Sequence, residues 1–326
     1  MSKSEILVIS EKAEPEMISQ HINKILRYVL SFEELFHRIH IISSFDVELV
    51  KNMKIPKKVV FHQVVTWRRL RGYIRLVFHA LYLLRVLVYC TKILKRNRRI
   101  IVVSNTWGHC TLGVIVIFLS KVFRRRSLVR VAGDVDIATM TFRKRYGKLL
   151  GIFFERIICK SQEYVLKNAD IIISVSQVFL EKYPQYAHKT EIVTNLFPVV
   201  DTYCKQELKK VARKSEAMEI LYVGRLEHEK GVDILLRSLV GLENVKCSIV
   251  GDGSLMNELK EKSVFLGVRD KVKFYGNLPQ EEVYRRMMKA DILVLPSYTE
   301  YTPNVLIEAA ALGLPVIASN VGGVRY

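Results

Sequence analysis

The sequence contains little that would support export, disulfide cross-linking or a metal centre. Its five cysteines, in 326 residues, include no C-x-x-C pair, and none lies at metal-ligand spacing from a histidine. A reducing compartment is therefore expected. The first residues, MSKSEILVIS, change from polar to a short apolar run and lack the pattern of a secretory signal. The expected location is therefore the cytoplasm.

Long uninterrupted apolar runs are also missing. The most apolar segment, residues 68 to 99, is interrupted by Arg75, His79 and Arg85, so no run reaches the roughly 18 to 20 residues that a membrane span requires. Apolar residues recur in it at helical spacing, and arginines cluster at its start, which predicts a basic amphipathic helix. Such a helix either faces a core with snorkelling arginines or docks onto anionic lipid headgroups.

Acidic residues are few for the number of basic ones. Asp and Glu number 32 against 51 Lys and Arg, which gives a formal net charge of +19. The expected partner is anionic: nucleic acid, an acidic membrane surface or a phosphorylated small molecule. The basic residues are spread over many segments, and no RNA- or DNA-reading motif with interleaved aromatics occurs, so nucleic acid is not expected.

Two series of short β-branched runs alternate with helical stretches, a pattern typical of parallel sheets crossed by helices. The polar, basic stretch 205–218 between them predicts a linker. The predicted fold is therefore α/β, with two Rossmann-like, doubly wound domains at 1–204 and 219–326 facing across a cleft. Strands are predicted at 6–9, 39–43, 59–62, 100–103, 128–131, 171–175 and 192–194, and then at 220–224, 247–251, 272–276, 292–296 and 315–319.

Unusual polar residues follow two strands of the second series, where ligands bind in such sheets. Arg225 and Lys230 follow ILYVG, and Glu300 and Glu308 follow ILVLP. Taken alone, the first two fit an ordinary solvated loop and Glu300 a surface carboxylate. Glu308 lies in an apolar helix, where a buried carboxylate requires a partner, and near the helix start, where the dipole stabilises it. The run GDGSLM (251–256) lacks the third glycine of G-x-G-x-x-G and by itself predicts only a tight turn.

Several longer segments carry a family resemblance. GRLEHEKGVDILLRSL, SIVGDGSLMNELK, VKFYGNL and ADILVLPSYTEYTPNVLIEAAALGLPVIASNVGG occur in this order. Together they resemble the nucleotide-sugar-binding domain of retaining glycosyltransferases of the family 4 type, which have the GT-B fold. The resemblance implies transfer of a sugar from a nucleotide-diphosphate sugar to a glycan or lipid-linked acceptor, with retention of the anomeric configuration.

The resemblance also implies roles for single residues. Arg225 and Lys230 are expected to bind the donor diphosphate, Glu300 to face the donor sugar, and Glu308 to accept hydrogen bonds from the ribose. Fixed cations stabilise the charge that grows on a departing phosphate. No Asp-x-Asp stands where a divalent cation would bind, so neither a metal nor a cofactor is expected. Further donor contacts are implied for Gly224, Gly251, Gly253, Pro303, Asn304 and Val305.

The sequence departs from the family pattern in three places. No glycine-rich loop follows the first strand, and Gly133-Asp134 stands where relatives often have a histidine. Asp134 and His109 are therefore the acceptor-side candidates. The sequence ends at GGVRY, where relatives continue, so a C-terminally truncated second domain is expected. A catalytically inactive nucleotide-sugar-binding fragment and a GT-B epimerase or phosphorylase remain alternatives, and peripheral attachment to the inner face of the membrane is a further expectation.

Overall fold

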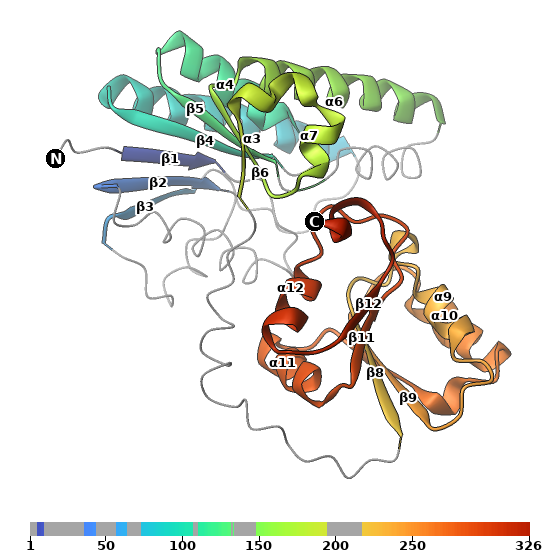
Figure 1. Ribbon diagram of the computed structural model, residues 1–326. Coiled ribbons are helices and arrows are strands. Elements are labelled where there is room, and N and C mark those ends of the chain that lie inside the picture. Colours follow the sequence, from blue (N-terminus) through green and yellow to red (C-terminus); the bar gives the residue numbers. More distant parts are fainter. Residues whose placement is uncertain are drawn as a thin grey trace. The chain divides into compact units, whose positions relative to one another are not determined.

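A computed structural model divides the chain into two compact units, Met1–Val193 and Thr194–Tyr326 (Figure 1). It describes residues 5–9, 36–43, 57–63, 73–106, 110–131, 133, 148–193 and 217–326. The linker predicted at 205–218 lies almost wholly outside these ranges, as do the acceptor-side candidates His109 and Asp134. These three assignments stay predictions.

The first unit is built on a seven-stranded parallel sheet with the order β3-β2-β1-β4-β5-β6-β7. The order reverses at β1, which lies between β2 and β4, as in a doubly wound fold. The register aligns Ile6 of β1 with Ile39 of β2 and Ile101 of β4. The strands are β1 (Glu5–Ile9), β2 (Arg38–Ser43), β3 (Val59–Gln63), β4 (Ile100–Thr106), β5 (Ser127–Val131), β6 (Ile171–Ser174) and β7 (Thr190–Ile192).

Three described helices of this unit run alongside one another (Figure 1): α3 (Tyr73–Arg96), α4 (Cys110–Val122) and α6 (Lys148–Asn168). A short helix α7 (Val178–Lys182) and a 3-10 helix (Pro184–Lys189) follow β6. In α3, Val86, Cys90 and Leu94 recur at helical spacing and are buried in one core with Leu7 of β1. The interpretation of this segment as a core-facing helix is confirmed for its second half. No helix in the described ranges is long and apolar enough to cross a membrane.

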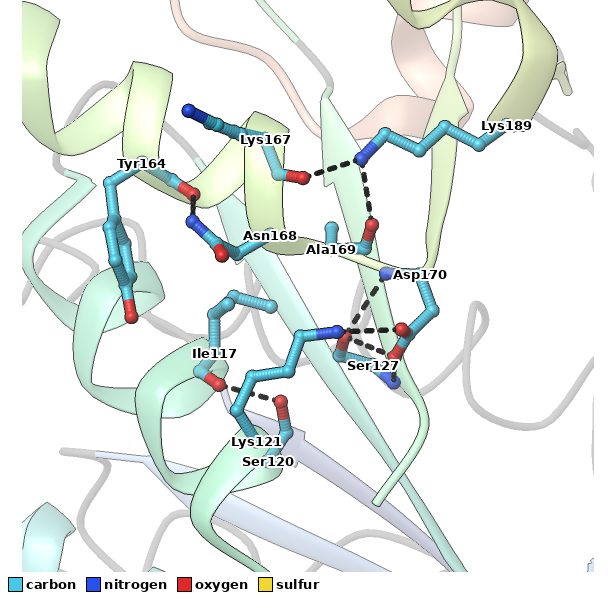
Figure 2. A network of polar contacts seen from close by, with 10 residues as sticks. All are labelled: Ile117, Ser120, Lys121, Ser127, Tyr164, Lys167, Asn168, Ala169, Asp170 and Lys189. Carbon is cyan, nitrogen blue, oxygen red and sulfur yellow. Dashed lines mark hydrogen bonds and ion pairs between the residues drawn. The ribbon is translucent and has the colours of Figure 1, made fainter. Parts of the chain in front are cut away.

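A polar network ties together the turns that enter β5, β6 and β7 (Figure 2). Asp170 accepts hydrogen bonds from Lys121 Nζ and from both the backbone N–H and the hydroxyl of Ser127, each at 2.8 Å. Lys189 Nζ donates to the carbonyls of Lys167 and Ala169 at the end of α6, both at 2.9 Å. Burial acts to raise the pKa of Asp170, but the bonds from Lys121 and Ser127 outweigh it and hold the pKa below its usual value.

The second unit is a five-stranded parallel sheet with the order β10-β9-β8-β11-β12, which reverses at β8. Helices α9 and α10 share one core with the sheet, and α11 and α12 contribute to another. Figure 1 shows the two pairs of helices on opposite sides of the strands. All strands predicted in both series are confirmed, with ends shifted by a few residues. The elements are β8 (Met218–Val223), α9 (Val232–Ser238), β9 (Val245–Val250), α10 (Met256–Phe265), β10 (Val272–Gly276), α11 (Gln280–Lys289), β11 (Ile292–Leu295), α12 (Asn304–Ala311) and β12 (Val316–Ala318).

Candidate functional site

The predicted site residues of the second unit lie where its strand order reverses. Strands β8 and β11 are neighbours, with Leu221 opposite Leu293. The loops 224–231 and 296–303, which follow these two strands, therefore emerge side by side at the carboxyl edge of the sheet. Open α/β sheets bind ligands at this point because two adjacent loops diverge there to opposite faces.

Lys230 and Glu300 meet across these two loops. Lys230 Nζ lies 2.6 Å from Glu300 Oε1, and the Ser297 hydroxyl donates to the same oxygen at 2.7 Å. The two charged side chains are only 17% and 6% exposed. A buried carboxylate requires such partners, and here both are supplied by the protein. The structure thus joins two predicted catalytic residues that are 70 positions apart in the sequence.

Arg225, the second predicted cation, lies at the start of the loop after β8. Its Nη2 atom is 2.7 Å from Glu229 Oε1, and its side chain is 60% exposed. The backbone carbonyl of Arg225 accepts a hydrogen bond from the buried Tyr222 hydroxyl at 2.9 Å. Burial, with the negative charge of Glu300 as a further cause, raises the pKa of Tyr222 above its usual value. The neutral phenol therefore fixes the backbone of Arg225, while the guanidinium extends into solvent.

Contacts that the sequence did not indicate hold the two loops together. The backbone N–H of Tyr298 donates to the carbonyl of Glu229 at 2.9 Å. The rings of His228 and Tyr298 stack, with centroids 5.5 Å apart and an angle of 18° between the planes. Ser297, Glu229, His228 and Tyr298 thus join the site through pairings between distant loops. In the sequence, Glu229 could be recognised as a charged residue between the predicted cations. The other three residues gave no such signal.

Two of the predicted donor-binding glycines are required by close backbone packing. Gly251 has a φ of +130°, and a Cβ there would collide with the carbonyl oxygen of Gly224. A Cβ at Gly253 would collide with the carbonyl of Leu226. The loop after β9 therefore packs directly on the loop after β8, and only glycine permits this approach. This structural requirement holds whether or not a ligand is bound.

Carboxylates already accept hydrogen bonds from the loop after β9. The N–H of Gly253 donates to Asp252 Oδ1 at 2.8 Å. Ser254 donates to both carboxylate oxygens of Glu227, from its N–H at 2.9 Å and from its hydroxyl at 2.6 Å. A phosphate that used these groups would have to displace the carboxylates.

Glu308 does not occupy the buried position expected for it. Helix α12 begins at Asn304, immediately after the buried Pro303, so Glu308 lies beyond the first turn, where the helix dipole acts most strongly. Its side chain is partly exposed and accepts a hydrogen bond from Gln280 Nε2 at 3.4 Å. The expectation that Glu308 is the buried carboxylate is wrong, because α12 buries Ala309 instead. Among the described residues, the buried carboxylate is Glu300. The ribose contact assigned to Glu308 stays a prediction.

The remaining predicted contacts lie at the start of α12. The backbone N–H groups of Asn304 and Val305 belong to its first turn, the end of a helix that attracts anions. Among the described residues, no group of three or more His, Cys, Asp or Glu side chains is arranged to hold a metal ion. The edge thus presents two cations, each beside one carboxylate, next to a helix N-terminus. This arrangement can bind an anion that carries two negative groups.

Comparison with known proteins places this unit beside sugar-transferring enzymes. Residues 205–326 match the family model described as glycosyl transferases group 1. TuaC of Bacillus subtilis, named a putative teichuronic acid biosynthesis glycosyltransferase, is 37% identical over 125 residues, which are 36% of this chain and 30% of that protein. The chain spans less than half the length of the first curated relatives that it matches.

Solved structures extend the likeness to both units. HepE from Anabaena, crystallised with UDP and glucose, has a TM-score of 0.65 at 18% identity, with 99% of this chain and 82% of that chain covered. Sucrose-phosphate synthase from Thermosynechococcus elongatus has a TM-score of 0.69 at 18% identity, with 99% and 83% covered. The predicted fold class is confirmed: the chain has the mixed α/β fold with two parallel sheets of GT-B glycosyltransferase structures, and residues 205–326 match glycosyl transferases group 1.

Proposed function

We propose that the protein transfers a sugar from a nucleotide-diphosphate sugar to a glycan or lipid-linked acceptor with retention of the anomeric configuration, without a metal or cofactor. The observation that carries this proposal is the Lys230–Glu300 pair at the reversal point of the second sheet, with Arg225 in the same loop as Lys230. Two cations, of which Lys230 lies beside a buried carboxylate, fit a donor that presents a diphosphate joined to a sugar.

Lys230 can donate hydrogen bonds to the Glu300 carboxylate and to a phosphate at the same time. A lysine ammonium group has three N–H donors, and one of them is directed at Glu300 Oε1. The others remain for phosphate oxygens, so the donor need not break the ion pair. Arg225 contributes a planar fork that fits phosphate oxygens in a bidentate manner, although its present contact with Glu229 competes for that fork.

In the proposed reaction, the bond from the anomeric carbon to the leaving phosphate oxygen breaks while the acceptor oxygen bonds to the same face of that carbon. The acceptor proton passes to the departing phosphate oxygen, so no protein base is assigned. Negative charge grows on the diphosphate as the bond breaks. Lys230 and Arg225 stabilise that charge from fixed positions, which is an efficient form of electrostatic catalysis. Glu300 faces the sugar and holds Lys230 in place.

The proposal extends to the acceptor and the location. TuaC is named for teichuronic acid biosynthesis, and HepE was crystallised with UDP and glucose. By analogy, we infer a UDP-sugar as the first donor to try and a cell-surface glycan precursor as the acceptor class, used at the cytoplasmic face of the membrane. Asp134 and His109 are the acceptor-side residues that this proposal carries forward from the sequence.

Nucleotide release tests the proposal. Purified protein is incubated with a panel of UDP-, GDP- and ADP-sugars, alongside Lys230→Ala, Glu308→Ala and the control Lys289→Ala, an exposed lysine of α11. Release from one donor that the first two substitutions abolish and the control retains would support the proposal, and the anomeric configuration of the product tests retention. If a donor binds but is never turned over, the protein binds nucleotide sugars without transferring them, and the transferase proposal fails. If no donor binds, the whole proposal is contradicted.

A further inference from the structure

The positive charge of the chain does not come from the unit that would bind the donor. Residues 217 to 326 contain 13 Lys and Arg against 14 Asp and Glu, so the other 38 basic and 18 acidic residues precede them. The donor diphosphate therefore explains two cations, Arg225 and Lys230, but not the charge of +19. Another anionic partner has to be sought on the first unit.

Six exposed cations of the first unit lie at the end of α3 and in two neighbouring connections at the amino edge of its sheet. Lys95 and Arg96 end α3, Arg98 and Arg99 belong to the connection from α3 to β4, and Arg124 and Arg126 belong to the connection from α4 to β5. We call these six residues the basic edge. Within the described ranges, none of the six has a carboxylate partner. Their charges are therefore available to an outside anion.

Hydrogen bonds hold the two turns side by side. Arg125, between Arg124 and Arg126, donates from Nε to the carbonyl of Asn97 at 3.0 Å and from Nη2 to the carbonyl of Leu94 at 3.1 Å. The N–H of Val102 in β4 donates to the carbonyl of Arg126 at 3.0 Å. The partly buried Arg125 side chain therefore holds the two connections of the basic edge together, while the six cations around it are exposed.

The neighbouring network limits how far this positive surface is neutralised. Asp170, the described carboxylate next to the α4–β5 connection, is engaged by Lys121 and Ser127 (Figure 2). Glu5 at the start of β1 is engaged by His40 Nε2 at 3.2 Å. These two carboxylates of the described part of the edge thus have partners of their own, and neither is paired with the basic edge.

Exposed apolar side chains lie on the two helices that lead to the basic edge. Leu84 and Val88 are one turn apart on α3, and Phe118 and Val122 are one turn apart on α4, and these two helices pack against each other. Apolar side chains next to cations are typical of surfaces that lie in a membrane interface. Single-stranded nucleic acid is bound through several exposed rings, whereas Phe118 is the one aromatic ring among the large exposed apolar side chains described in this unit.

We propose that the basic edge, with the exposed apolar side chains of α3 and α4, docks on a membrane surface that contains anionic lipids. Strands of four to seven residues span about 13 to 23 Å, so docking by the amino edge leaves the carboxyl edge of the same sheet open to water. The inference deepens the proposed function, since it names the surface that brings a transferase to a lipid-linked acceptor, but its experiment does not depend on sugar transfer.

Vesicle sedimentation tests the docking. The full chain is mixed with vesicles of phosphatidylcholine alone, or of phosphatidylcholine with phosphatidylglycerol, at near-physiological ionic strength. The variant Arg98→Gln/Arg99→Gln/Arg126→Gln removes three cations of the basic edge. Its matched control, Lys246→Gln/Lys260→Gln/Lys289→Gln, removes three exposed cations of the second unit. Because each cation near an anionic surface contributes about 1 kcal/mol, the partition coefficient of the first variant should fall on the order of 100-fold.

The expected result is binding to the anionic vesicles that weakens with salt, is lost in the basic-edge variant and persists in the control. Equal partitioning of the unchanged protein onto both kinds of vesicle would overturn the proposal, and so would an equal loss in both variants. Equally tight binding to RNA at the same salt would also overturn it, in favour of a general polyanion site. Far-ultraviolet circular dichroism confirms that the variants are folded. Nucleotide release without vesicles should be the same in the variant as in the parent, which separates this test from that of the transferase.

Discussion

The Lys230–Glu300 pair makes a quantitative prediction about stability. Lys230→Met leaves Glu300 with the Ser297 hydroxyl as its remaining described partner, in a position where only 6% of the carboxylate side chain is exposed. Breaking a buried ion pair costs about 3 to 5 kcal/mol because an uncompensated charge stays behind. The Lys230 side chain is 17% exposed, so water still reaches the ion pair in part. We therefore expect the lower end, a loss of roughly 3 kcal/mol of unfolding free energy in the second unit.

Pulsed hydrogen exchange read by mass spectrometry follows the two units separately in one urea titration, because each peptide belongs either to Met1–Val193 or to Thr194–Tyr326. Lys230→Met should shift the urea midpoint of the described peptides of the second unit and leave the midpoint of those of the first unit unchanged. Lys289→Met is the control, because this lysine is exposed on α11.

A double substitution separates the ion pair from the packing of the site. Replacing a buried pair by apolar residues of similar volume is often nearly neutral, so Lys230→Met/Glu300→Met should recover most of the stability that Lys230→Met loses. If Lys230→Met is as stable as the Lys289→Met control, the pair does not hold the two loops together and the reasoning is refuted.

Other consequences follow from the same contacts. Glu229→Gln should tighten UDP binding about two- to fivefold by calorimetry, because an exposed ion pair of up to about 1 kcal/mol no longer occupies Arg225; unchanged or weaker binding would contradict a competing role for Glu229. Gly251→Ala should destabilise the second unit by at least about 2 kcal/mol, since its φ of +130° and the adjacent carbonyl of Gly224 exclude a Cβ; a stability equal to that of the parent would refute the close approach. Burial, with the nearby His40, lowers the pKa of His62 from 6.5 to about 4. The folded first unit then binds fewer protons than the unfolded chain, so its stability, present above pH 6.5, should fall as the pH drops from 6.5 to 4. Urea unfolding of His62→Asn, followed by circular dichroism, should depend less on pH in this window, and an unchanged slope would exclude His62 as a cause.

Much of the fold could be predicted from the sequence because each buried strand is a short continuous run of β-branched or apolar residues. ILYVG and ILVLP each became a parallel strand, and the polar residues after them came together because the carboxyl ends of neighbouring parallel strands meet. The motif order also identified Lys230 and Glu300, which the structure joins.

The environment of the carboxylates could not be predicted. An apolar helix suggested that Glu308 was buried, but in α12, which begins after Pro303, its side chain is partly exposed, while Glu300 is enclosed by a loop from another strand. The basic edge could not be predicted from the sequence either. The net charge was visible in the composition, but its location depends on turns that are brought together by strand order and by the Arg125 hydrogen bonds.

Hydrogen exchange with and without nucleotide tests the central claim most directly, namely that the loops after β8 and β11 bind the donor. The protein is labelled in deuterated buffer alone and with UDP, GDP or ADP, and the peptides are compared by mass spectrometry. The account predicts that one nucleotide slows exchange in peptides covering 224–231 and 296–305 and leaves the peptides of α3 unchanged, and that Lys230→Ala abolishes this protection. Protection confined to the first unit, or none with any of the three nucleotides, would contradict it.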